Sequence, residues 1–152
     1  MSEQLTTRGG VRYRLVRRHK YCIESVALFR MPPRHPLDLD GRDSVRFSNP
    51  TRTATLALFT PLLVTLFPGF RYNGPDVVPD TENSMDSSMG HDAICDAMNA
   101  GLISPANYKA ANALMYQEDR KHGMTACRAR IRWRGVNAHW RRKAAGMDWP
   151  RV

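Results

Sequence analysis

The sequence predicts an α+β fold, with a small antiparallel sheet of about four to six strands followed by three helices. Three observations predict it. Apolar and polar residues alternate with a period of two in the first half of the chain, as in half-buried strands. Beyond residue 85 the apolar spacing becomes helical. The length of 152 residues suits a single domain over 1–152, mainly β over 1–75, helical over 85–145 and ending in a tail over 146–152.

Several short strands are expected before residue 73. The alternating segments are Val11–Val16, Tyr21–Phe29, Ser44–Phe47 and Phe70–Tyr72. Between them, 31–41 is rich in proline and charge and is expected to be a loop. Asn73 and the next two residues, Gly74 and Pro75, indicate a turn after the last of these strands.

An uncharged stretch of 18 residues, Thr53–Phe70, reaches the lower limit of a membrane span. Pro61 and Pro68 interrupt it. Two buried strands, Thr53–Phe59 and Leu62–Phe67, explain the pattern better than a membrane span, because each piece has the length of a strand.

Three helices are expected in the second half. The first covers Asp86–Ala100 and stops at Gly101. The second opens with Ser104 as N-cap and Pro105 at its first position, and it runs to about His122. The third starts near Thr125 and ends near Ala145.

The three cysteines, Cys22, Cys95 and Cys127, are odd in number and far apart. This favours reduced thiols in a cytosolic setting. Cys95 and His91 have the i, i+4 spacing of two zinc ligands, but no second ligand pair follows. The first residues are polar and do not resemble a signal peptide, so secretion by that route is not expected.

The net charge of +9 is strongly segregated. The balance is +6 over residues 1–52, −4 over 53–127 and +7 over 128–152. Basic ends could bind the phosphates of nucleic acid or of lipid headgroups. They could equally be solvated faces, or pair with the acidic middle of the same or a neighbouring subunit.

Arginine and tryptophan in the third helix are candidate partner-binding residues, because protein–protein interfaces are enriched in both. The same composition permits nucleic-acid contact, although no helix-turn-helix, zinc-finger or RRM signature is present. The candidates are Arg128, Arg130, Arg132, Trp133, Arg134, Trp140, Arg141 and Arg142. The four arginines that alternate at period two would spread around a helix rather than form one stripe.

His91 and Asp92 on the first helix are the candidate catalytic pair. His91 shares a helix face with Cys95 and apolar residues, where a histidine is more often part of the core. Otherwise it is a general base or a ligand, with Asp92 orienting a cation or a partner.

Asp92 and Asp96 lie one helical turn apart and would repel each other unless a positive group lies between them. Asp76 could join them around a calcium or magnesium ion. An arginine of the third helix would serve the same purpose and is the preferred explanation. No cofactor is therefore expected, and a divalent cation is the alternative. No GxSxG, HExxH, P-loop or dinucleotide-binding motif is present.

Two segments resemble a family of small phage and prophage proteins of unknown function. Residues 67–79 are similar to its strand-and-turn motif P-x-G-F-x-Y-D-G-A-S-x-P, and 91–95 to its helical motif H-D-x-L-Y. The resemblance covers about 45–123. Asn73 and Asn112 stand where this family has aspartates, and Cys95 where it has tyrosine. Two acids are therefore missing around His91.

The same helix distantly resembles the His-Asp helix of secreted phospholipases A2, in which a histidine is the base and an aspartate binds calcium. Asp119 would then be the supporting acid on a facing helix. The disulfides and the glycine-rich calcium loop of those enzymes are missing here.

The resemblance and the segregated charge lead us to expect a phage virion or assembly protein, such as a tail, neck or accessory component. Its partners would be other virion proteins in a symmetric assembly, formed in the host cytoplasm. One alternative is a small metal-assisted hydrolase of lipid or cell wall that uses His91 and Asp92. Another is a nucleic-acid-binding accessory protein.

Overall fold

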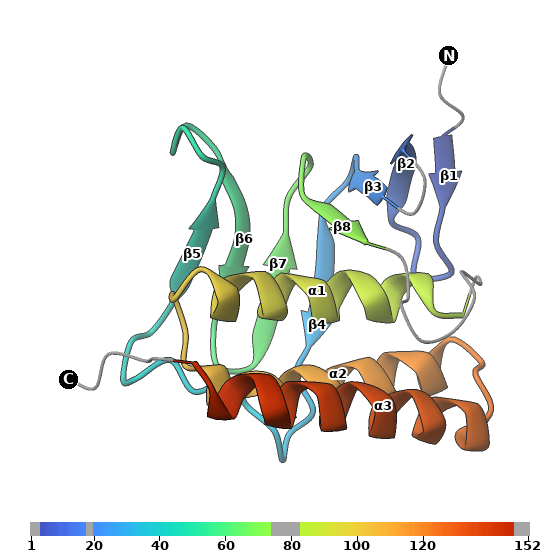
Figure 1. Cartoon of the computed structure of the whole chain (residues 1–152). Coiled ribbons are helices and arrows are strands. Elements are labelled where there is room, and N and C mark those ends of the chain that lie inside the picture. Colours follow the sequence, from blue (N-terminus) through green and yellow to red (C-terminus); the bar gives the residue numbers. More distant parts are fainter. Residues whose placement is uncertain (1–3, 18–19, 74–82, 148–152) are drawn as a thin grey trace.

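The computed structural model describes residues 4–17, 20–73 and 83–147, and within them the chain forms eight strands followed by three helices. The strands are β1 (Gln4–Thr6), β2 (Arg12–Arg17), β3 (Lys20–Ile23), β4 (Ala27–Arg30), β5 (Val45–Ser48), β6 (Thr55–Phe59), β7 (Leu63–Leu66) and β8 (Arg71–Asn73). The helices are α1 (Met85–Asn99), α2 (Tyr108–Lys121) and α3 (Ala126–Ala145), with a 3-10 turn, Pro105–Asn107, before α2. Strands followed by helices confirm the predicted α+β class (Figure 1).

The strands form two antiparallel sheets of four strands each, where the sequence predicts one sheet. Sheet A has the order β1-β2-β3-β8, and sheet B the order β4-β7-β6-β5. The chain changes sheet inside Tyr21–Phe29, which the sequence predicts as one strand, because β3 ends at Ile23 and β4 starts at Ala27. The Ser25 hydroxyl holds this bend by accepting the backbone N–H of Arg12 at 2.9 Å.

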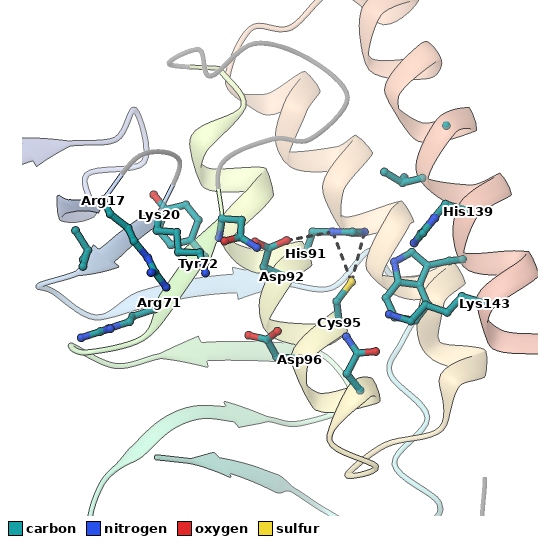
Figure 2. A pocket seen from close by; sticks show the side chains of 16 residues that line it. Arg17, Lys20, Arg71, Tyr72, His91, Asp92, Cys95, Asp96, His139 and Lys143 are labelled. Carbon is teal, nitrogen blue, oxygen red and sulfur yellow. Dashed lines mark hydrogen bonds and ion pairs between the residues drawn. The ribbon is translucent and has the colours of Figure 1, made fainter. Parts of the chain in front are cut away.

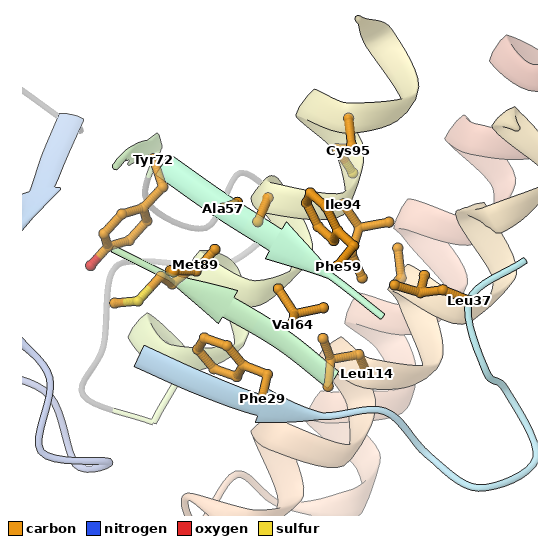
Figure 3. Packing of buried hydrophobic residues seen from close by; sticks show 14 of the residues in the cluster. Phe29, Leu37, Ala57, Phe59, Val64, Tyr72, Met89, Ile94, Cys95 and Leu114 are labelled. Carbon is orange, nitrogen blue, oxygen red and sulfur yellow. The ribbon is translucent and has the colours of Figure 1, made fainter. Parts of the chain in front are cut away.

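The main core lies between the inner face of sheet B and helices α1 and α2 (Figure 3). Phe59 and Val64 of the sheet and Met89, Ile94 and Leu114 of the helices are fully buried. Strands β6 and β7 confirm that the uncharged stretch is two buried strands. Among the described residues, no helix is both long enough and apolar enough to cross a membrane.

Local signals set the helix ends as predicted. Gly101 follows α1 with a φ of +72°, a conformation that favours glycine. The Ser104 hydroxyl accepts the Ala106 N–H at 3.2 Å, and the Thr125 hydroxyl accepts the Arg128 N–H at 3.3 Å. Both are N-caps, which supply a partner for helix N–H groups that otherwise lack one.

Gly90 lets α1 approach its neighbours closely. A Cβ at this position would lie 3.2 Å from the side chains of Phe29 on β4 and Leu114 on α2. The next residue is His91, so this close approach sets the depth at which the His91 side chain enters the structure.

Candidate active site

A cleft of about 750 Å³ opens where sheet A, α1 and α3 meet (Figure 2). Its α1 side carries five polar residues, His91, Asp92, Cys95, Asp96 and Asn99. The sheet side carries Arg17, Lys20 and Arg71, and the α3 side His139, Trp140 and Lys143. The structure thus gathers the candidate catalytic pair and two of the three candidate metal ligands along one wall.

His91 is held from its far side by α2. Its Nε2 atom lies 2.8 Å from Oδ1 of Asn112, a fully buried residue. The amide nitrogen of Asn112 donates to Oδ1 of Asn137 on α3 at 3.3 Å. Because Asn112 uses its nitrogen there, its oxygen accepts from His91, and Nε2 carries the hydrogen. In the neutral ring Nδ1 is then the free base.

Cys95 and Asp92 of α1 also contact the ring. The thiol sulfur is 3.6 Å from Nδ1 and 3.8 Å from Nε2 of His91. Asp92 Oδ1 lies 3.7 Å from Nδ1, and Asp92 Oδ2 accepts the backbone N–H of Asn73 at 2.9 Å. Since the sulfur is at similar distances from both ring nitrogens, a rotation of the imidazole is needed to aim Nδ1 at it. Catalytic hydrogen bonds are often loose in this way before a substrate binds.

The charges around His91 favour its protonated form. Burial lowers the pKa of His91, but the nearby Cys95 and Asp92 outweigh it, so the pKa lies well above its ordinary value. Burial, and then the neighbouring Asp92, raise the pKa of Asp96 to about 7. Burial also raises the pKa of Tyr72, whose hydroxyl has no hydrogen-bond partner within the described part of the chain.

The predicted metal site is not assembled by the residues that the structure describes. Asp76 lies outside them, as does most of the turn motif, 74–79. No group of three His, Cys, Asp or Glu residues in 4–17, 20–73 and 83–147 could hold an ion. An arginine of α3 is expected between Asp92 and Asp96, but none of the α3 arginines that the structure describes lines the cleft beside them, and the buried Arg132 pairs with Asp119.

The candidate partner-binding residues of α3 divide into three sets. Arg132 and Trp140 are buried, 3% and 5% exposed. Arg130, Trp133 and Arg134 line a second groove of about 500 Å³ with Tyr116 of α2. The remaining candidates, on or near the surface, are Arg128, Arg141 and Arg142.

The sequence did not indicate the basic residues of sheet A as part of the site, and it linked Asn112 to His91 only through the resemblance to the phage family. One local signal was available for Asn112: it lies three residues before Met115 and so shares a helix face with that apolar residue. A buried amide on such a face requires a hydrogen-bond partner. Nothing local linked Arg17, Lys20 or Arg71 to His91, because the pairing of β8 with β3 brings them together.

Comparison with protein-family models, curated proteins and solved structures found no significant match. The resemblance to phage proteins therefore stays a prediction based on short motifs.

Proposed function

We propose that the cleft is the active site of a thiol hydrolase or acyl transferase, with Cys95 as nucleophile, His91 as base and Asn112 as the group that orients His91. One observation carries the proposal: in the wall of an open cleft, the His91 ring contacts both the Cys95 thiol, 3.6 Å from Nδ1 and 3.8 Å from Nε2, and the Asn112 amide oxygen, 2.8 Å from Nε2. Cys-His-Asn is a combination that cysteine hydrolases use.

The departures from the phage-family pattern support this proposal. Cys95 and Asn112 are two of the three departures, and both side chains contact the His91 ring. The sequence alone suggests that the loss of acids weakens the chemistry. With Cys95 in contact with His91, the pair of changes instead exchanges one set of partners for another that also supports nucleophilic catalysis.

The reaction would proceed in two balanced steps. The Cys95 proton passes to His91 Nδ1, the sulfur bonds to the substrate carbonyl carbon, and the leaving group departs with that proton. Water then gives a proton to His91 and its oxygen to the carbonyl, which releases the acid and the thiol. Asp92, 3.7 Å from Nδ1, stabilises the imidazolium formed in each step. Asn99, one turn after Cys95 in the same cleft, offers amide donors for the oxyanion.

The test is site-resolved alkylation by iodoacetamide, read by mass spectrometry of peptides. Exposed Cys127 is the internal reference within the same chain. At about pH 6 we expect Cys95 to react on the order of tenfold faster than Cys127, because the His91 ring lies in contact with the Cys95 sulfur and can accept the thiol proton. His91→Gln should abolish the excess rate at Cys95 and leave Cys127 unchanged.

Two variants test whether the orientation of the His91 imidazole matters. Asn112→Ala should reduce the excess rate at Cys95, whereas Asn137→Ala, one step further from the ring, should have a smaller effect. A Cys95 that reacts no faster than Cys127 over the whole pH range, or one indifferent to His91→Gln, contradicts the proposal. Hydrolysis of activated esters and thioesters, lost in Cys95→Ser, would complete the case.

The α2–α3 groove favours a second candidate function, a virion or assembly protein acting through protein contacts. Arg130, Trp133 and Arg134 combine arginine with an aromatic residue on one surface next to Tyr116, the composition of interface hot spots. Size-exclusion chromatography with light scattering tests this. The proposal would be contradicted if the protein stays monomeric at high concentration and if Trp133→Ala leaves the mass of its mixtures with other virion proteins unchanged.

A further inference from the structure

The sheet side of the cleft is formed by three basic side chains, Arg17 on β2, Lys20 on β3 and Arg71 on β8. Arg17 and Lys20 are direct cross-strand partners. Arg71 on β8 lies opposite Cys22 of β3. Cys22 is two residues after Lys20, so Arg71 projects from the same face of sheet A as Lys20. In Figure 2 these side chains lie across the cleft from His139 and Lys143, with His91, Asp92 and Cys95 between the two sides.

Like charges placed directly opposite each other destabilise a sheet. The ion pairs within the described residues do not relieve this repulsion, since those of arginine join Arg14 with Glu24, Arg42 with Asp40, and Arg132 with Asp119, and the others join histidines with acids. None of the three cleft residues takes part in an ion pair in the part of the chain that the structure describes. A stabilising partner for them would have to come from outside those residues.

The remaining charges leave the cleft positive. Lys143 adds a fourth basic group on the α3 side, where its ammonium lies 4.5 Å from the centre of the Trp140 ring. Among the described residues that line the cleft, the acids are Asp92, which faces His91 and a backbone N–H, and Asp96. Because burial and Asp92 raise the pKa of Asp96 to about 7, Asp96 carries only part of a negative charge near neutral pH.

We infer that the substrate carries an anionic group, a phosphate or a carboxylate, which Arg17, Lys20 and Arg71 bind while Cys95 attacks the carbonyl carbon. The choice of Cys95 as the reacting atom rests on the proposed function, whereas the anion site stands on the basic side chains alone. Guanidinium groups bind both kinds of anion through paired hydrogen bonds. A bound anion also offsets the repulsion between Arg17 and Lys20.

Two alkylating reagents of matched size test the anion site. With both iodoacetate and iodoacetamide the thiolate displaces iodide at the CH2 carbon, giving a carboxymethyl or a carbamoylmethyl thioether, and only iodoacetate carries a carboxylate. The measured quantity is the ratio of their rates at Cys95. We expect Lys20→Glu combined with Arg71→Glu to lower this ratio on the order of tenfold at low ionic strength, since a charged cleft concentrates counter-ions. Added salt should shrink the difference.

The control is Arg46→Glu, a single charge reversal at an exposed position of β5 away from the cleft, against which Lys20→Glu and Arg71→Glu are also compared one at a time. It should leave the ratio at Cys95 unchanged, and Cys127 should respond equally little to the cleft variants. Protection of Cys95 by inorganic phosphate or by acetate at equal ionic strength then tells a phosphate site from a carboxylate site.

The outcomes separate this inference from the proposed function. Slow alkylation of Cys95 with a ratio that still responds to the cleft variants keeps the anion site and removes the nucleophile. Fast alkylation with an unresponsive ratio keeps the nucleophile and overturns the anion site. If Cys95 reacts with neither reagent, thermal stabilisation by inorganic phosphate decides. An increase in melting temperature that disappears in the cleft variants, but not in Arg46→Glu, supports the site, and no such increase overturns it.

Discussion

At the scale of single residues, the pKa of Asp96 reports on the burial and the charges in the cleft. Asp96 lies one turn from Asp92 and faces the same cleft. Burial and this neighbour raise its pKa from the ordinary 3.8 to about 7. A carboxyl group whose pKa is higher in the folded than in the unfolded chain stabilises the fold at low pH, and that contribution is lost as the pH rises through the interval between the two values.

We therefore predict that Asp96→Asn changes the pH dependence of stability. From about pH 4 to about pH 7 the free energy of unfolding of the original chain should fall relative to that of the variant, because only the original chain ionises at this position. Urea unfolding at several pH values measures this difference. Asp43→Asn, at an exposed site, is the control and should give no slope. An Asp96→Asn difference that is constant with pH would show that the carboxyl is not perturbed.

At the scale of elements, one arginine joins α3 to the other two helices. Arg132 is 3% exposed and donates to Asp119 on α2 and, at 2.7 Å each, to the hydroxyls of Ser87 and Ser88 on α1. Asp119 is fully buried, so removal of Arg132 would leave a carboxylate without its compensating charge. Breaking a buried pair from one side costs much more than replacing both partners.

Arg132→Met is expected to lower the free energy of unfolding by about 3–5 kcal/mol. Adding Asp119→Leu should recover much of that loss, because the double variant leaves no unpaired charge. Arg141→Met, an exposed position of the same helix, serves as control with an expected change of less than about 0.5 kcal/mol. Chemical denaturation provides all of these values. Equal losses in Arg132→Met and Arg141→Met would mean that the buried pair does not hold α3.

At the scale of the whole molecule, Asp86 links sheet A to the helices. It lies in the first turn of α1, accepts the Thr7 hydroxyl at 2.6 Å and accepts the Gly9 N–H at 3.1 Å. Thr7 and Gly9 belong to the turn between β1 and β2. A Cβ on Gly9 would lie 2.7 Å from an Asp86 oxygen, so only glycine allows this approach.

Asp86→Ala should therefore release the β1–β2 hairpin without unfolding the core. Hydrogen–deuterium exchange is expected to accelerate over Gln4–Arg17 and to stay slow in β6 and β7. Asp86→Asn, which keeps an acceptor oxygen, should give a smaller effect. A uniform acceleration along the chain would mean that Asp86 stabilises the fold as a whole rather than this one junction.

Much of the fold could be predicted because its signals are local. The caps Ser104 and Thr125 and the glycine stop at Gly101 lie within a few residues of the backbone groups that they satisfy. Strand β1, Gln4–Thr6, was not predicted, since three residues are too few to show an alternation. The division into two sheets was not predicted because it depends on which strands pair, and those pairings join residues far apart in sequence.

The sequence by itself determined the α+β class, the helix ends, the two buried strands from the uncharged stretch, and the placement of His91, Cys95 and Asp96 on one helix. Tertiary structure alone decided which groups surround His91. Asn112 is 21 residues away along the chain, and the basic side chains of sheet A enter the cleft only because β8 pairs with β3. Helix spacing is a property of neighbouring residues. The groups that surround the buried His91 ring depend instead on how elements far apart in the sequence pack together.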